Sequence, residues 1–219
     1  IQVTAGSDYA SADLQLYDAT GNIASLTVSA GGSSSDASAY IEIDGTLGTI
    51  TVHATGRSSD AYVNVNGESS SRVTLDSSDI NVTASGDTAV PWDPTTAGLN
   101  LYNASGDIHS LTVSAQGISS DAHASIYTEG SVAAITVEAM GRSSDASAYI
   151  DTVGCADVNS VHMSDGSTIQ VTAGSGDYAG ADLQLYDATG NIASLTVSAG
   201  GFLSDASANI EIDGTLGTI

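Results

Sequence analysis

The sequence predicts an all-β protein built as a parallel β-solenoid, or β-helix, whose short strands wind into stacked coils of about 24–34 residues. Three observations carry this prediction. A motif recurs along the whole chain, apolar and polar residues alternate strictly around it, and no helical periodicity fills the intervals. Parallel strands that are joined without helices, at this period, are typical of one coil stacked on the next.

The recurring motif is Gly-Asn-Ile-Ala-Ser-Leu-Thr-Val-Ser-Ala at Gly21–Ala30. It returns unchanged at Gly190–Ala199 and nearly unchanged at Gly106–Ala115. Looser copies lie around Gly48–Ala54 and Gly130–Ala139. A motif that returns this often indicates a repeat protein, in which each copy cannot bury its apolar face alone and must stack on its neighbours.

Two strands with one buried face each are predicted in every coil. In the first, Leu26, Val28 and Ala30 point inward and the polar residues between them point outward. The second runs over Asp36–Ile43, and we expect its apolar residues to point inward: Ala37, Ala39, Ile41 and Ile43. Between such strands two apolar residues lie three apart, as Leu47 and Ile50 do, and this spacing predicts a corner.

The first inward residue of each coil should belong to one buried column. These residues follow one another at intervals of 24 to 34 positions: Ile1, Leu26, Ile50, Ile80, Leu111, Ile135, Ile169, Leu195 and Ile219. Residues 169–219 nearly repeat residues 1–50, so a six-coil block begins again at Ile169, and the block 1–168 contains an older three-coil repeat. We therefore expect one continuous solenoid over residues 1–219, with repeat blocks 1–168 and 169–219, as a segment of a longer chain.

The charge is strongly unbalanced, with a formal net charge of −23 and only Arg57, Arg72 and Arg142 as cations. Nucleic acids and anionic membrane surfaces are excluded as partners on this ground, because binding them requires lysine and arginine. No apolar run is long enough to span a membrane. Cys155 is the single cysteine. It is interpreted as a small residue at a coil corner, with an intermolecular disulfide or a reactive thiol as alternatives.

An aspartate recurs ten residues after the start of a strand, each time between Ser and Ala. Stacked coils would bring these carboxylates into a column about 4.8 Å apart. One interpretation is a calcium site, since calcium prefers oxygen ligands; the alternative is that each carboxylate accepts hydrogen bonds from its own turn. The glycine-rich nonapeptide typical of calcium-binding repeats is absent from the sequence. The calcium candidates are Asp36, Asp60, Asp121, Asp145 and Asp205.

A second outward column consists of threonines, and the preference of threonine for strands explains it better than an ice-binding surface does. Its members are Thr27, Thr51, Thr112, Thr136 and Thr196. Tyr17, Tyr102 and Tyr186 occupy equivalent positions of the three-coil repeat. We expect them to be structural anchors at a corner, with stacking against a sugar as the alternative. No metal-ligand spacing relates the histidines, which are His53, His109, His123 and His162.

Three segments depart from the regular coil. Ala89–Gly98 contains Trp92 between two prolines, Pro91 and Pro94, and is predicted to be an exposed loop. Ser69–Ser78 and Val158–Gly166 are predicted to add a strand at one edge.

The repeated motif resembles that of very large bacterial surface proteins, the extracellular parallel β-helix repeat proteins of the haemagglutinin or adhesin type. The resemblance implies secretion and a role in adhesion or in a sheath or fibre. We therefore expect an extracellular or cell-surface structural protein that self-associates into filaments, with divalent cations as further partners. An adhesin that binds carbohydrate, or binds in a calcium-dependent way, is the alternative. A polysaccharide-active enzyme is disfavoured, because every acidic residue belongs to a repeated column rather than to a unique cluster, so no catalytic residue is assigned.

Overall fold

A computed structural model describes residues 1–67, 73–86, 94–151 and 161–219. They form eleven strands in one sheet, without a helix, and every pairing between strands is parallel. The predicted all-β parallel fold is confirmed. The strands are β1 (Gln2–Gly6), β2 (Tyr9–Thr20), β3 (Ile23–Gly31), β4 (Ser34–Thr55), β5 (Ser58–Asn66), β6 (Val73–Ser85), β7 (Pro94–Gln116), β8 (Ser119–Glu129), β9 (Ser131–Met140), β10 (Ser143–Asp151) and β11 (Val161–Thr218).

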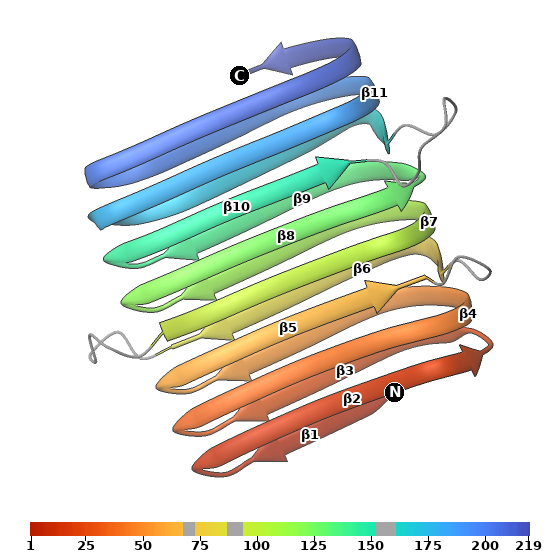
Figure 1. The fold of residues 1–219 in the computed structure, drawn as a ribbon, viewed down its shortest axis with the longest axis vertical. Coiled ribbons are helices and arrows are strands. Elements are labelled where there is room, and N and C mark those ends of the chain that lie inside the picture. Colours follow the sequence, from red (N-terminus) through yellow and green to blue (C-terminus); the bar gives the residue numbers. More distant parts are fainter. Residues whose placement is uncertain (68–72, 87–93, 152–160) are drawn as a thin grey trace.

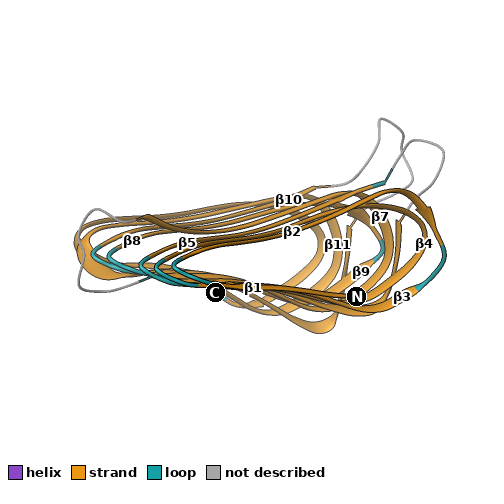
Figure 2. Cartoon of the chain, turned by 90° about the horizontal axis from the view of Figure 1, so that it is seen from below, coloured by secondary structure: helices purple, strands orange, loops and turns teal. Residues whose placement is uncertain are grey.

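The coils are flattened and stack along one axis (Figure 1). Viewed near that axis, each coil has two layers that are joined by a turn at one edge and by curved strands at the other (Figure 2). The layer that contains β1, β3, β9 and the second halves of β4, β6 and β7 is the threonine face. The layer that contains β2, β5, β8, β10 and the first halves of β4 and β7 is the tyrosine face. The long strand β11 contributes to both.

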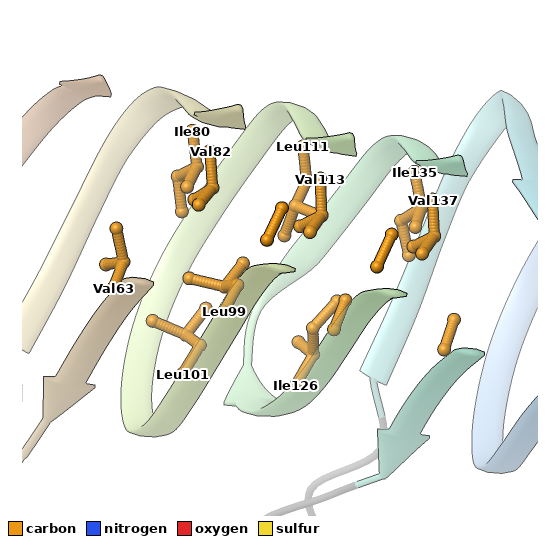
Figure 3. Packing of buried hydrophobic residues seen from close by; sticks show 14 of the residues in the cluster. Val63, Ile80, Val82, Leu99, Leu101, Leu111, Val113, Ile126, Ile135 and Val137 are labelled. Carbon is orange, nitrogen blue, oxygen red and sulfur yellow. The ribbon is translucent and has the colours of Figure 1, made fainter. Parts of the chain in front are cut away.

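The predicted buried column exists. Leu26 pairs with Ile50, and the register continues coil by coil through Ile80, Leu111, Ile135 and Ile169. All six side chains are buried. Figure 3 shows part of this column beside the neighbouring column of Val82, Val113 and Val137. Ile1 and Ile219 are exposed, because they lie in the two outermost coils.

The second layer packs against the first with smaller side chains at its start and larger ones at its end. The residues predicted to point inward, Ala37, Ala39, Ile41 and Ile43, are all buried. Leu99, Leu101 and Ile126 fill the equivalent positions in later coils (Figure 3). Apolar burial of this kind contributes about 25 cal/mol per Å², and it fixes the register because a shift by one residue would turn the polar face inward.

Two predictions about irregular segments are wrong in part. Pro94–Gly98 is not a loop, because it opens β7, where Pro94 pairs with Ser119. Proline is tolerated as the first residue of a strand, since the N–H that it lacks is not needed there. The described parts of Ser69–Ser78 and Val158–Gly166 do not add a strand at an edge. Leu75 pairs with Leu47, and Met163 pairs with Val132, so the described parts follow the ordinary corner of the coil. Pro91, Trp92 and Cys155 lie outside the described residues.

Candidate functional site

The predicted aspartate column forms, but it is interrupted. Asp36 pairs with Asp60 on the next coil, and Asp121 pairs with Asp145 in the same way. A threonine separates the two pairs, and a glycine follows the second. In order, the column is Asp36, Asp60, Thr96, Asp121, Asp145 and Gly180. The carboxylates therefore meet as pairs at strand spacing instead of as a continuous row.

One carboxylate of each pair has a raised pKa, chiefly because it is partly buried and secondly because of the neighbouring carboxylate. Burial, and next the neighbouring carboxylate of Asp145, raise the pKa of Asp121. Burial, and next Asp60 and Asp13, raise the pKa of Asp36. Asp121, Asp145 and Asp205 line a surface groove of about 700 Å³. Within the described ranges none of the five candidate aspartates accepts a hydrogen bond, and no three acidic, histidine or cysteine side chains converge on a metal position. Calcium binding at this column stays a prediction.

Asp121→Asn is expected to raise the melting temperature at pH 7. The pKa of Asp121 is raised in the folded state, so the charged carboxylate costs stability at neutral pH, and this cost disappears below the usual value of 3.8. The difference in melting temperature between the variant and the parent protein should therefore shrink as the pH falls from 7 towards 3.8. Thermal unfolding monitored by circular dichroism between pH 3 and pH 7 checks it. Two results together would instead identify Asp121 as a calcium ligand. The variant would be less stable than the parent protein at pH 7, and added calcium, but not EDTA, would raise the melting temperature of the parent protein.

The threonine column is also confirmed in register and is also interrupted. It runs along the threonine face, where Asn81 replaces a threonine in one coil and Gln170 in another. The members in order are Thr27, Thr51, Asn81, Thr112, Thr136 and Gln170. The histidines form no cluster in the described part of the chain. His123 lies 2.8 Å from the hydroxyl of Ser147, and His162 lies 3.4 Å from that of Thr189.

Tyrosine side chains form the most distinctive surface feature, on the tyrosine face. Four rings from four successive coils lie in one row, which we call the tyrosine row: Tyr102, Tyr127, Tyr149 and Tyr186. Their ring centroids are 5.6, 5.4 and 5.7 Å apart in that order. A shorter row of Tyr17 and Tyr40, 5.0 Å apart, lies in the first coils. Tilted and edge-on aromatic pairs at these distances are mutually stabilising.

The residue that follows each of three of these tyrosines has a left-handed backbone conformation, and after Tyr17 and Tyr102 the strand pairing also bulges. Asp18, Asn103 and Asp187 have φ values of 47°, 53° and 49°, and each directly follows a tyrosine of the repeat. Asparagine and aspartate tolerate this left-handed conformation better than most residues. At Asn103 the side-chain amide donates a 2.8 Å hydrogen bond to the carbonyl oxygen of Gly67 in the preceding coil. The bulge therefore has a fixed geometry, and it sets the direction of the tyrosine before it.

Polar side chains beside the rings are held by hydrogen bonds. The amide of Gln184 donates to Asp182 at 2.9 Å and accepts from the hydroxyl of Tyr186 at 3.5 Å. Asp13, Gln15 and Tyr17 repeat this triplet, with distances of 2.7 and 3.5 Å.

The backbone of Tyr149 does not lie beside the backbones of the other tyrosines in the row. Its backbone pairs with Ser125 and Gln184, two positions before the column that contains Tyr127. Its hydroxyl donates a 2.9 Å hydrogen bond to Asp151, which occupies that column. This hydrogen bond raises the pKa of the Tyr149 hydroxyl above its usual range and keeps the phenol protonated. The side chain therefore leans into the row between Tyr127 and Tyr186.

Sequence reasoning found three members of this surface and missed three. Tyr17, Tyr102 and Tyr186 lie near the end of their strand, as expected of residues before a corner, but they face outward, with Tyr17 57% and Tyr102 47% exposed. Tyr40, Tyr127 and Tyr149 were not identified, since they do not occupy the same position of the three-coil repeat. A sequence pattern that could have identified them is a tyrosine at an outward-facing position of a strand whose inward-facing residues are alanine and isoleucine.

Comparisons of the chain with protein-family models, with curated proteins and with solved structures gave no significant match. No helix that could cross a membrane is present among the residues the structure describes.

Proposed function

We propose that this chain is part of an extracellular structural protein that self-associates into filaments, fibres or a sheath. The observation that carries the proposal is the coil-on-coil stacking among the described residues, where one parallel pairing follows another from β1 to β11. Stability in such a stack comes from each coil and its neighbours, so the number of coils, and with it the length, is not limited by the fold.

The charge of the surface supports the same proposal. With a net charge of −23, rods repel one another at low ionic strength and stay dispersed. Salt screens this repulsion, since the screening length falls to about 8 Å at physiological ionic strength, and divalent cations bridge carboxylates. Phe202 and Leu203 replace Ser33 and Ser34 of the first block and are exposed, Phe202 by 89%. They provide an apolar contact for lateral association.

Electron microscopy of the purified protein in salt is the test. We expect long uniform filaments with an axial repeat near six coils, roughly 29 Å from the strand spacing. The matched control replaces Phe202 and Leu203 with serine, as in the first block, and should give single filaments with less lateral bundling. Dispersed monomers at high protein concentration, in salt and with divalent cations, would contradict the proposal.

A cell-surface adhesin is the second candidate, and the tyrosine row is the observation that favours it. In this row Tyr102 is exposed and the other three rings are half-buried, and aromatic side chains at a surface next to oriented amide and carboxylate groups are typical of binding surfaces. The two candidates are compatible, because a fibre outside a cell can also hold a ligand. Both are non-enzymatic, and neither assigns a catalytic role to any residue.

A further inference from the structure

We propose that the tyrosine row binds a neutral, unbranched polysaccharide whose chain runs along the solenoid axis, across the strands. This inference deepens the adhesin candidate and does not depend on assembly into filaments. It rests on three features of the tyrosine face: the spacing of the rings, the polar groups beside them and the charge of the molecule.

The rings repeat at the spacing of the coils, so the row is itself a linear repeat. Tyr102, Tyr127, Tyr149 and Tyr186 lie 5.4 to 5.7 Å apart, one from each of β7, β8, β10 and β11. A pyranose ring with its glycosidic bond advances a chain by a comparable length. Successive sugar residues can therefore meet successive tyrosines. The apolar C–H face of a sugar packs on an aromatic ring, and the hydroxyls of Tyr149 and Tyr186 keep their hydrogen bonds to neighbouring side chains.

The polar groups suit the rim of a sugar, which carries hydroxyls that both donate and accept hydrogen bonds. Gln184 and Asp182 are held together at 2.9 Å beside Tyr186, and Asp151 is held by Tyr149. Asn209 of the next coil donates to the Tyr186 hydroxyl at 2.9 Å. A carboxylate and an amide offer several acceptor and donor positions each, so at Asp182 and Gln184 these bonds leave capacity for a ligand. Because the side chains are oriented before binding, less conformational entropy is lost when the ligand binds.

Charge selects a neutral chain over an acidic one. The net charge is −23, and three arginines are the only basic side chains besides histidine in the sequence. Arg142 already forms a 3.0 Å ion pair with Asp177. A polysaccharide of uronic acids or sulfated sugars would be repelled by this surface. A chain of uncharged hexoses or N-acetylated amino sugars would not be.

Affinity gel electrophoresis of the full chain gives the first test. Gels contain hydroxyethylcellulose, glucomannan or glycol chitin as neutral polymers, and polygalacturonate as the acidic one. We expect at least one neutral polymer to retard the protein and polygalacturonate to leave its mobility unchanged. Retardation by none of the neutral polymers, or by polygalacturonate alone, would overturn the proposal.

Variants of one ring then locate the site. Tyr127→Ala should weaken binding to the retarding polymer about tenfold, because it removes a stacking partner from the middle of the row. Tyr127→Phe keeps the ring and should bind as the parent protein does. The matched control is Tyr9→Ala, since Tyr9 is 85% exposed and lies outside the row. Equal loss in Tyr127→Ala and Tyr9→Ala, or loss in Tyr127→Phe, would show that ring stacking in the row is not the contact.

A third measurement uses the unmodified protein, so it does not depend on how the variants fold. Calorimetric titration with oligosaccharides of the retarding polymer should show affinity that increases from the disaccharide to the hexasaccharide, because a longer chain meets more rings of the row. Affinity that is independent of length would indicate a single pocket and overturn the proposal. The filament proposal is tested separately, since Tyr127→Ala should leave filaments in salt unchanged by microscopy.

Discussion

Val113→Asp is expected to destabilise the solenoid by more than about 4 kcal/mol. Val113 is fully buried in the middle of the stack, where it pairs with Val82 on one coil and Val137 on the other (Figure 3). An aspartate there would place a charge without a partner among aliphatic side chains of three coils. Because domains are stable by only about 5–15 kcal/mol in total, a loss of this size removes a large share of the stability, and we expect the melting temperature followed by circular dichroism to fall far below that of the parent protein.

Thr112→Asp is the control for this variant. Thr112 is the preceding residue, and its side chain lies on the outer surface between Asn81 and Thr136. A carboxylate at this position stays hydrated, so the free energy of unfolding in urea should change by less than about 1 kcal/mol. Similar unfolding curves for the two variants would show that the inward and outward assignments of this strand are wrong.

Gly106→Ala is expected to cost about 3 kcal/mol or more. Gly106 has a φ of +95°, which is unfavourable for any residue with a Cβ. A Cβ atom would also lie 2.1 Å from the carbonyl oxygen of Leu75 in the preceding coil. Two costs add up. Backbone strain at this φ costs about 1–2 kcal/mol. The added Cβ atom also pushes one coil away from the next, and overpacking of this kind costs about 1–3 kcal/mol.

Gly166→Ala separates these two contributions. Gly166 has a similar φ of +83°, but nothing lies within 4 Å of the position of a Cβ. We expect a loss of only about 1 kcal/mol from backbone strain. Equal midpoints in urea for the two variants would mean that close approach between coils at Gly106 contributes nothing to stability.

Alternation and spacing were sufficient to predict the core of this protein. The inward positions Leu26, Ile50 and Ile80 repeat at the coil length, and a strand with one apolar face admits one register. The structure of the irregular segments is harder to predict from sequence, because a proline shows only that one backbone N–H donor is missing. The two prolines predict a loop that includes Pro94, but Pro94 is the first residue of β7, where the backbone N–H that proline lacks is not needed.

The tyrosine row could be predicted only in part, because it combines residues from non-equivalent positions. Tyr102 and Tyr127 directly follow Leu101 and Ile126, which pair across two coils just before a register shift, so their proximity follows from register. Tyr149 starts two residues earlier and enters the row through its hydrogen bond to Asp151. The direction of the Tyr149 side chain depends on its rotamer and on the neighbouring coil, and a sequence pattern does not specify either. The aspartates were placed correctly in a column, but their separation into pairs by Thr96 required the register of a strand that breaks the repeat.

The coil-to-coil register also determines how such a chain can fold. Leu26 pairs with Ile50, 24 positions later, and the longest of these steps is the 34 positions from Ile135 to Ile169. Each new coil therefore closes a loop of similar size onto an existing template, and the entropy of closure increases only slowly with loop length. The cost of the next coil does not depend on how many coils precede it. Growth from a first pair of coils thus resembles polymerisation within one chain, and the slow event is the formation of that first pair.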